Sequence, residues 1–145
     1  MKRTVIALFA VLAALPLAAA ENRVLIAKED TVYKKALIRA LVDELEDGNT
    51  EVVVIDHRKG ELDGVDPADY DVVFITNSGA QARVRPEVMA WLDSVAGRDG
   101  NVILHTTQIT DWEPDVAVDS ITSASQKRNI DELVVDIAER IRRYF

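Results

Sequence analysis

Cysteine is absent from this chain of 145 residues, and glycine and proline are sparse, with six and four residues. Without cysteine there is no disulfide, no thiolate zinc site, no cysteine-ligated iron–sulfur cluster and no cysteine nucleophile. The composition, 48% hydrophobic and 29% charged, excludes a collagen-like, low-complexity or disordered chain. We therefore expect one globular domain, and any redox chemistry would need a bound cofactor.

Positive charge is also in short supply. Seventeen Lys and Arg residues stand against 25 Asp and Glu residues, which gives a formal net charge of -8. Proteins that bind nucleic acid draw most of their affinity from cationic side chains on the phosphate backbone. The acidic balance therefore argues against a nucleic-acid partner.

The first twenty residues have the pattern of a secretory signal peptide. Lys2 and Arg3 give a basic start, an apolar run follows from Val5, and small residues end the segment at Ala20. The run is shorter than the roughly 20 residues that span a bilayer, and no stop-transfer segment follows it. We expect cleavage after Ala20, which leaves an acidic domain, residues 21–145, in the periplasm or outside the cell and without a membrane span. A retained anchor is the alternative.

Two kinds of apolar segment alternate along the remaining chain. Short, nearly continuous apolar runs predict buried strands at residues 23–28, 51–55, 70–76 and 101–106. Apolar residues at helical spacing predict helices over residues 31–47, 86–97 and 130–141. Alternation over residues 116–122 predicts a fifth, shorter strand and leaves 108–115 as a long loop. This order indicates an α/β fold whose five-stranded parallel sheet is covered on both faces.

Ligands of open α/β sheets bind at the carboxyl ends of the strands, near the point where the strand order reverses. The segments expected there are residues 28–31, 56–59, 77–81, 105–112 and 122–126. These segments hold most of the uncharged polar side chains of the chain. The strand ends are therefore where we look for a site.

One stretch resembles a known family. DYDVVFITNSG at 69–79, then RP at 85–86 and MAWLD at 89–93, resembles the third strand, flavin loop and following helix of the flavodoxins, and VILHTT at 102–107 is similar to their fourth strand. The resemblance covers residues 23–145 in element order and residues 70–107 in detail. It implies a flavodoxin-like three-layer sandwich over residues 21–145, with FMN as the cofactor.

The loop after the first strand departs from that family. Flavodoxins hold the FMN phosphate in a glycine- and hydroxyl-rich loop, where backbone N–H groups and the helix dipole favour an anion. Here the loop, AKEDTVY at 27–33, has no glycine, and Glu29 and Asp30 place carboxylates in it. Lys28 and Thr31 remain as candidate phosphate contacts. The alternative is that Asp30, or Thr31, caps the following helix.

Polar residues at two strand ends, with one tryptophan, are the candidates for a ring site. They are Asn77, Ser78, His105, Thr106, Thr107 and Trp112. Trp112 would stack on a planar ligand, or else pack against the sheet, whereas Trp91 lies on a predicted core stripe. His105 is a candidate for proton transfer, but its only fellow histidine, His57, stands at no metal-binding spacing, and no metal site or catalytic set is predicted.

A second, shorter resemblance concerns DSITSAS at 119–125. This segment is similar to the signature at which periplasmic flavinyltransferases attach FMN to the last hydroxyl, with Ser123 in place of a glycine and Ser125 in place of the usual threonine. The alternative is an ordinary strand-to-helix turn in which Ser125 or Asn129 caps the last helix.

Two functional hypotheses result. The first is an exported flavodoxin-like protein that binds a small planar ligand, a flavin above all, in envelope electron transfer. The second is a cofactor-free interaction module of the same fold with a protein partner in the periplasm. The missing phosphate loop favours the second hypothesis, while the polar strand ends and Trp112 favour the first.

Overall fold

The computed structural model describes residues 20–145, so the predicted signal peptide lies outside the described residues except for Ala20. A sheet of five parallel strands forms the centre, in the order β2-β1-β3-β4-β5. The strands are β1 (Asn22–Lys28), β2 (Thr50–Asp56), β3 (Val72–Ser78), β4 (Val102–Thr107) and β5 (Asp119–Ser123). The predicted parallel five-stranded sheet is thereby confirmed. No helix within residues 20–145 is long and apolar enough to cross a membrane.

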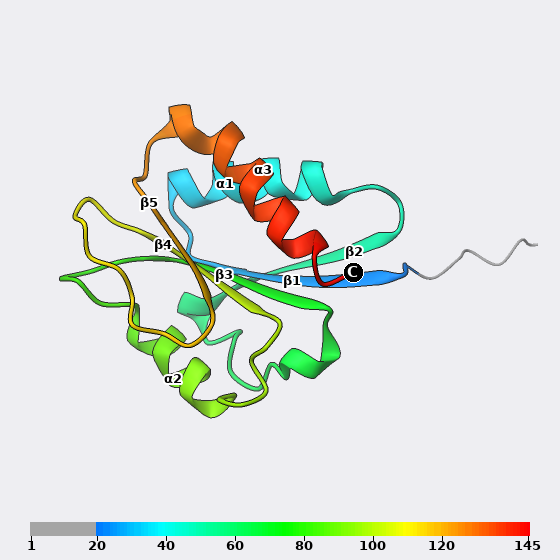
Figure 1. Ribbon diagram of the computed structural model, residues 1–145, viewed down its shortest axis with the longest axis horizontal. Coiled ribbons are helices and arrows are strands. Elements are labelled where there is room, and N and C mark those ends of the chain that lie inside the picture. Colours follow the sequence, from blue (N-terminus) through cyan, green and yellow to red (C-terminus); the bar gives the residue numbers. More distant parts are fainter. Residues whose placement is uncertain (1–19) are drawn as a thin grey trace, which may run out of the picture.

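Two helices pack together on one face of the sheet (Figure 1). They are α1 (Val32–Leu45) and α3 (Ile130–Arg142), and their apolar stripes meet alternate strand residues such as Ile26 and Phe74 in one buried cluster. In α3, Ile137 and Ile141 are fully buried while both ends of the helix carry charges that suit its dipole. The amphipathic spacing of α1 and α3 therefore determines which side of each helix packs on the sheet.

The other face has a single helix, α2 (Pro86–Ser94), and is completed by non-helical chain. Two short 3₁₀ turns, His57–Lys59 and Pro67–Asp69, stand between β2 and β3. Residues 108–118 run extended past α2, and from residue 111 onward their side chains alternate between exposed and half-buried. The half-buried members, which pack on this second cluster, are Trp112, Val116 and Val118. We call residues 111–118 the extended segment.

Trp91 of α2 is buried in the same cluster, as its position on the core stripe predicts. Its indole Nε1 donates a hydrogen bond to the carbonyl of Val65 at 3.1 Å. The loop between β2 and β3 is fastened to α2 in this way. Trp91 is therefore a structural residue of the core.

Three local predictions are wrong in detail. The fifth strand begins at Asp119 rather than Val116, because its ladder with β4 starts at the pair Ile103 and Asp119 and the preceding residues have no strand to pair with. Asn129 stands at the N-cap of α3 but its side chain caps nothing, since a 3₁₀ turn over Lys127–Asn129 leads into the helix. Ser125 is exposed and lies before that turn, so it does not cap α3 either.

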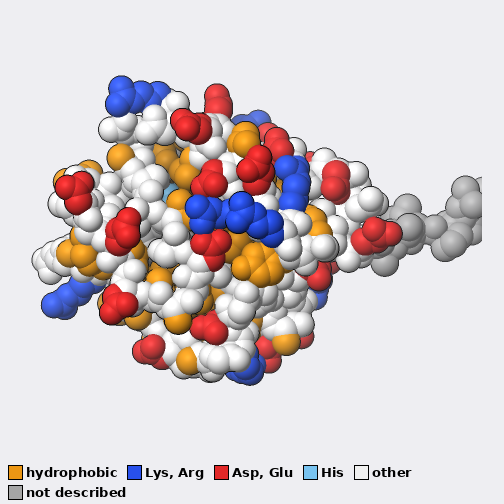
Figure 2. All heavy atoms as spheres, viewed as in Figure 1, with side chains coloured by type: hydrophobic (Ala, Val, Ile, Leu, Met, Phe, Trp, Pro, Cys, Tyr) orange, Lys and Arg blue, Asp and Glu red, His pale blue; other side chains and the backbone are white. Residues whose placement is uncertain are grey.

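Charge is spread rather than gathered on one face of the molecule. On the face seen in Figure 2, acidic and basic side chains are intermixed, and hydrophobic atoms appear in small separate patches. The net negative charge therefore gives no single-signed patch on this face.

Candidate functional site

The strand order reverses between β1 and β3. From β1 the chain crosses to β2 on one side, whereas β3, β4 and β5 follow one another on the other side. In such sheets the loops at the carboxyl ends separate at this point and leave a crevice for a ligand. The connections after β1, β3 and β4 all lie at this end of the sheet, at the left in Figure 1.

The connection from β1 to α1 is only three residues long, Glu29 to Thr31. Thr31 caps α1, because its hydroxyl accepts a hydrogen bond from the backbone N–H of Lys34 at 3.1 Å. The prediction that Asp30 caps this helix is wrong, since its carboxylate is exposed and pairs with Lys35 at 3.0 Å and with Lys28 at 3.7 Å. Both Lys28 and Thr31 are thus engaged within this short connection.

Lys34 is the unexpected residue of the site. Its side chain is 1% exposed, and Nζ donates hydrogen bonds to the carbonyl of Asn77 and to Oγ1 of Thr107, each at 2.9 Å. Burial lowers the pKa of Lys34 to about 7; the carboxylate of Glu29 opposes this shift and the guanidinium of Arg85 adds to it. Lys34 thereby ties the first turn of α1 to the ends of β3 and β4.

Glu29 is a second buried charge, 4% exposed. Its Oε2 lies 3.4 Å from Nη2 of Arg85, in the loop before α2. Within residues 20–145, Oε1 of Glu29 and Nε of Arg85 are buried without a hydrogen-bond partner. We call Glu29, Lys34 and Arg85 the charged corner.

The charged corner was not predicted as such. The sequence indicates Glu29 only as a carboxylate within the loop after the first strand, and it gives Lys34 and Arg85 no role in a site. A signal for Lys34 was present, because it precedes Leu37, Leu41 and Leu45 at helical spacing on the buried stripe of α1.

Asn77 fastens the loop that follows β3. Its side-chain Nδ2 donates to the carbonyl of His105 at 3.1 Å and to Oγ1 of Thr106 at 3.0 Å, and its Oδ1 accepts from the backbone N–H of Arg85 at 3.2 Å. Asn77, Thr106 and Thr107 are buried, and Ser78 is half-buried. The structure therefore brings these candidates together as a network that holds two loops in place.

His105 lies inside the sheet end, fully buried. Its Nδ1 is 2.8 Å from Oγ1 of Thr76 and its Nε2 is 2.8 Å from Oγ of Ser123, so hydroxyls flank both ring nitrogens. Burial, and secondly the charge of Lys34, lower the pKa of His105 to about 3. The ring is therefore neutral near pH 7 and joins β3 to β5 as a structural link.

The second histidine, His57, is also buried and sits near the same strand end. Its Nδ1 faces Oε1 of Glu87 at 3.3 Å, and its Nε2 faces the carbonyl of Thr76 at 3.2 Å. Between residues 20 and 145, no three His, Asp or Glu side chains are grouped so as to hold a metal ion.

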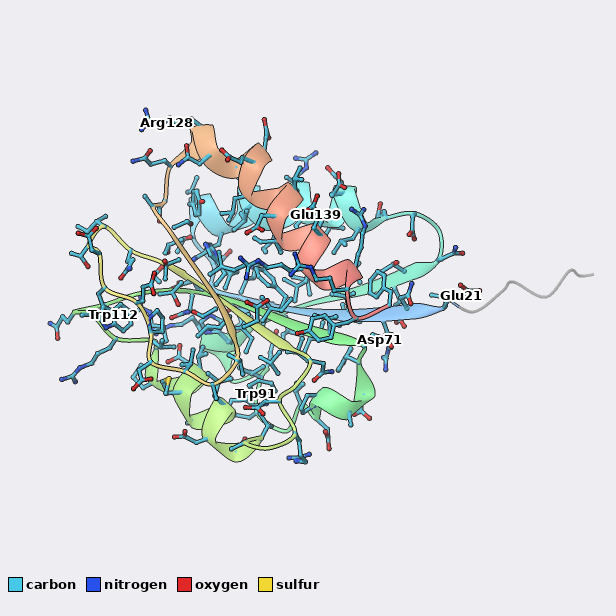
Figure 3. All side chains as sticks on the ribbon, in the orientation of Figure 1. Glu21, Asp71, Trp91, Trp112, Arg128 and Glu139 are labelled. Carbon is cyan, nitrogen blue, oxygen red and sulfur yellow. The ribbon has the colours of Figure 1, made fainter. Side chains whose placement is uncertain are left out.

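A pocket of about 380 Å³ opens between the loop after β3 and the extended segment. Its volume lies within the range of roughly 300–1,000 Å³ that is usual for small-molecule sites. Apolar groups form most of the lining, which comprises Ala82, Arg83, Val84, Pro86, Met89, Trp112, Pro114, Asp115 and Val116. Figure 3 places Trp112 at the carboxyl end of the sheet and Trp91 on the α2 face.

The loop that borders this pocket is strained. Gln81 and Ala82 both have φ near 53°, the left-handed region that non-glycine residues seldom adopt. Such conformations cost of order 1 kcal/mol or more each and cluster at ligand-binding segments. The strain marks residues 79–85 as a candidate ligand-contacting loop.

A smaller hollow of about 240 Å³ lies on the β5 side, between residues 108–111 and 122–124. Ile109 at its edge is 96% exposed. The exposed hydroxyl-bearing residue Ser125, the position of the flavinylation resemblance, follows directly in the chain.

The parallel order β2-β1-β3-β4-β5 with helices on both faces is a flavodoxin-like fold. A flavodoxin from the domain Archaea matches with a TM-score of 0.55 and 17% identity, over 83% of this chain and 99% of that one. A flavodoxin of Streptococcus pneumoniae TIGR4 matches with a TM-score of 0.53 and 13% identity, over 85% of this chain and 99% of that one.

The flavodiiron protein of Giardia intestinalis is also similar, with a TM-score of 0.59 and 13% identity over 88% of this chain, which spans 38% of that longer protein. No protein-family model and no curated protein sequence matches the chain. The similarity is therefore one of fold. Any statement about a ligand has to be argued from the residues of this chain.

The cofactor of flavodoxins, FMN, fits this chain only in part. At the start of α1 the connection is three residues long, its one hydroxyl is used in capping, and Glu29 fills the adjoining space with a buried carboxylate. Those groups do not suit a phosphate. The apolar pocket beside Trp112 does suit a planar ring.

Proposed function

We propose that this protein is an exported, flavodoxin-like ligand-binding protein that holds a small planar heterocycle, a flavin ring first of all, in envelope electron transfer. The observation that carries the proposal is the apolar pocket between the loop after β3 and the extended segment, with Trp112 in its wall. Its residues come from the loops after β3 and β4 and from the first turn of α2, and ligands of this fold class bind at the loops that follow the strands.

Each part of the chain has a task in that site. Trp112 offers the one aromatic face of the pocket lining, and Val84, Met89 and Val116 supply apolar walls that exclude water. The exposed Arg83 offers a cation at the rim for a polar ring edge. The buried bonds of Asn77 hold the loop after β3 so that this wall is preorganised.

A flavin bound here would supply reversible electron transfer. The chain's own contribution would be to orient the ring and keep water away from one of its faces. His105 is buried and neutral, so we assign it no proton transfer in this site.

Trp112 also provides the test. The chain has two tryptophans, so in a Trp91→Phe background the fluorescence of Trp112 alone reports a planar ligand. We expect riboflavin or FMN to quench it. Trp112→Ala should weaken the binding, measured by calorimetry, by about 1–3 kcal/mol, the usual loss when an aromatic stacking partner is removed. Unchanged affinity in Trp112→Ala would exclude this pocket as the ring site.

The second candidate is a cofactor-free interaction module in the periplasm. The observation in its favour is that the strand ends are tied together by the chain's own groups, above all by Lys34. These bonds hold the ends of β3 and β4 to α1 without a ligand.

Intact mass of the protein purified from its own host, recorded under native and denaturing conditions, separates the two candidates. A chain beginning at Glu21 that loses a flavin on denaturation supports the ligand-binding function and export together. A bare mature chain under both conditions supports the interaction module, and a flavin that survives denaturation points to covalent attachment at Ser125. A mass that includes residues 1–20 would contradict cleavage.

A further inference from the structure

We propose that the charged corner makes this protein select a ligand whose end near β1 is uncharged and carries a hydroxyl, and reject the phosphate ester of the same ligand. This inference rests on the proposed function, because it specifies the ligand of that site. For the flavin ring, it predicts riboflavin rather than FMN.

The first reason is the pair of unsatisfied atoms at the corner. Oε1 of Glu29 is a buried acceptor and Nε of Arg85 a buried donor, and neither has a hydrogen-bond partner within residues 20–145. Buried polar groups are nearly always paired, so such atoms call for a partner. A hydroxyl can donate to an acceptor such as Oε1 of Glu29 or accept from a donor such as Nε of Arg85, whereas an ionised phosphate only accepts.

The second reason is that the positive charges of the corner are committed elsewhere. Nζ of Lys34 points into the protein, where Asn77 and Thr107 accept its hydrogen bonds at 2.9 Å, and the side chain is 1% exposed. The guanidinium of Arg85 faces Glu29 at 3.4 Å. A phosphate arriving at the start of α1 therefore meets a buried carboxylate before it meets an available cation.

The third reason is that Arg85, a member of the charged corner, belongs to the chain segment that borders the pocket. Residues 84 and 86 on either side of it line the pocket beside Trp112, and its backbone N–H is fixed by Asn77. The loop that borders the ring pocket thus also supplies the partner of Glu29. One short loop links the apolar and the charged parts of the site.

The electrostatic cost to a phosphate ester follows from its charge. A phosphomonoester carries about -1.5 to -2 charges at pH 7, and a like charge held close by in a partly buried site opposes its binding. A tenfold loss in affinity needs only about 1.4 kcal/mol.

Riboflavin and FMN are the right probes because they share the ring and differ by the phosphate. We expect the wild-type protein to bind riboflavin at least about tenfold more tightly than FMN, as measured by calorimetry or by quenching of flavin fluorescence. In Glu29→Gln, which keeps the shape and removes the charge, this preference should fall to about threefold or less. Asp30→Asn is the matched control, since it removes an exposed neighbouring carboxylate and should leave the preference unchanged.

Each remaining outcome is decisive. FMN binding as tightly as riboflavin in the wild type overturns the inference and leaves the proposed function standing. If neither flavin binds, the proposed function fails, and inorganic phosphate then tests the corner alone through the backbone amide NMR shifts of residues 31–34. A phosphate-dependent shift in the wild type overturns the inference, while a shift seen only in Glu29→Gln supports it. If circular dichroism shows that Glu29→Gln does not fold, two measurements on the wild type decide. These are the ratio of its affinities for riboflavin and FMN, and its titration with phosphate.

Discussion

The two faces of the sheet are built in different ways. One face is closed by α1 and α3, whose buried stripes meet alternate strand residues in one continuous apolar cluster. The other is closed by α2, two 3₁₀ turns and the extended segment, in which every second side chain turns inward. On the first face a hollow of about 460 Å³ lies at the edge, between β5 and α3, and its lining includes the polar residues Glu132 and Asp136. The mainly apolar pocket beside Trp112 lies on the second face.

This difference teaches where a fold of this size keeps room for a ligand. Two packed helices interdigitate and leave few voids, because side chains at helical spacing fill each other's gaps. An extended segment presents only one inward side chain for every two residues. Its inward side chains Trp112 and Val116 form part of the wall of the apolar pocket.

The largest effect is expected on the helical face. Ile137→Ala in α3 removes a fully buried side chain and should lower the free energy of unfolding by about 2–5 kcal/mol, as measured by urea unfolding followed by circular dichroism. Val135→Ala on the same helix removes a side chain that is 51% exposed and serves as the control, with an expected loss of no more than about 0.5 kcal/mol. Equal losses would show that α3 does not carry the packing assigned to it.

Lys34 is a buried polar residue on the helical face. Its lowered pKa predicts that the stability of the protein depends on pH. Between pH 7 and about 10 the lysine is protonated in the unfolded chain but neutral in the folded one, because burial lowers the pKa of Lys34 to about 7. The unfolded state then binds more protons, so stability should rise with pH. Relative to Lys34→Met, the wild type should gain up to about 1.4 kcal/mol per pH unit over this range.

Urea midpoints of both proteins at pH 6, 7, 8 and 9 check this prediction. Below pH 7 the difference between them should be constant, since folded and unfolded lysine are then both protonated. Parallel curves from pH 7 to pH 9 would contradict the assignment of a buried, deprotonating amine.

A smaller effect is expected in the extended segment. Val116→Ala shortens a half-buried side chain that lines the pocket, and we expect a loss of about 0.5–1.5 kcal/mol in the free energy of unfolding. Ala117→Ser, at the exposed position next to it, should change stability by less than about 0.5 kcal/mol. Similar losses of stability at both positions would contradict the alternation of half-buried and exposed side chains in the extended segment.

The smallest change in stability is expected for a glycine substitution in the strained loop. Ala82→Gly relieves a positive φ of 53° but adds conformational freedom to the unfolded chain, so the net gain in stability should be at most about 0.5 kcal/mol. Ala82→Val, whose branched Cβ tolerates this conformation poorly, should instead lose about 1 kcal/mol or more. Thermal unfolding of the two variants measures the difference, and a stabilising valine would contradict the strain.

The sequence was sufficient for the architecture because the physical signals there are repetitive. Continuous apolar runs located β1 to β4, and helical stripes located α1, α2 and α3. The limits of β5 were misplaced because residues 116–118 alternate like a strand but have no neighbour to pair with. Alternation records which side chains are buried, not whether the backbone has a partner.

The candidate site was predicted less completely. Asn77 and His105 were expected at the strand ends and lie there, yet their polar atoms turn inward to neighbouring strands. The burial of Glu29 and Lys34 is not predictable from the sequence, because Glu and Lys are almost never fully buried unless paired. Their pairing depends on Arg85 and Thr107, which are far from them in the sequence, so only the fold reveals it.

β1 is an inner strand of the sheet, and both of its neighbours come later in the chain. β1 lies between β2 and β3, so that Leu25 pairs with Val53 on one side and with Val73 on the other. Until β3 has been made, β1 is an apolar ribbon with at least one open edge, and such edges invite pairing with other chains. The nascent protein therefore passes through a stage of synthesis at which Val24 to Ala27, which are buried in the folded state, lie on an open strand edge, and a chaperone would have to recognise them in that interval.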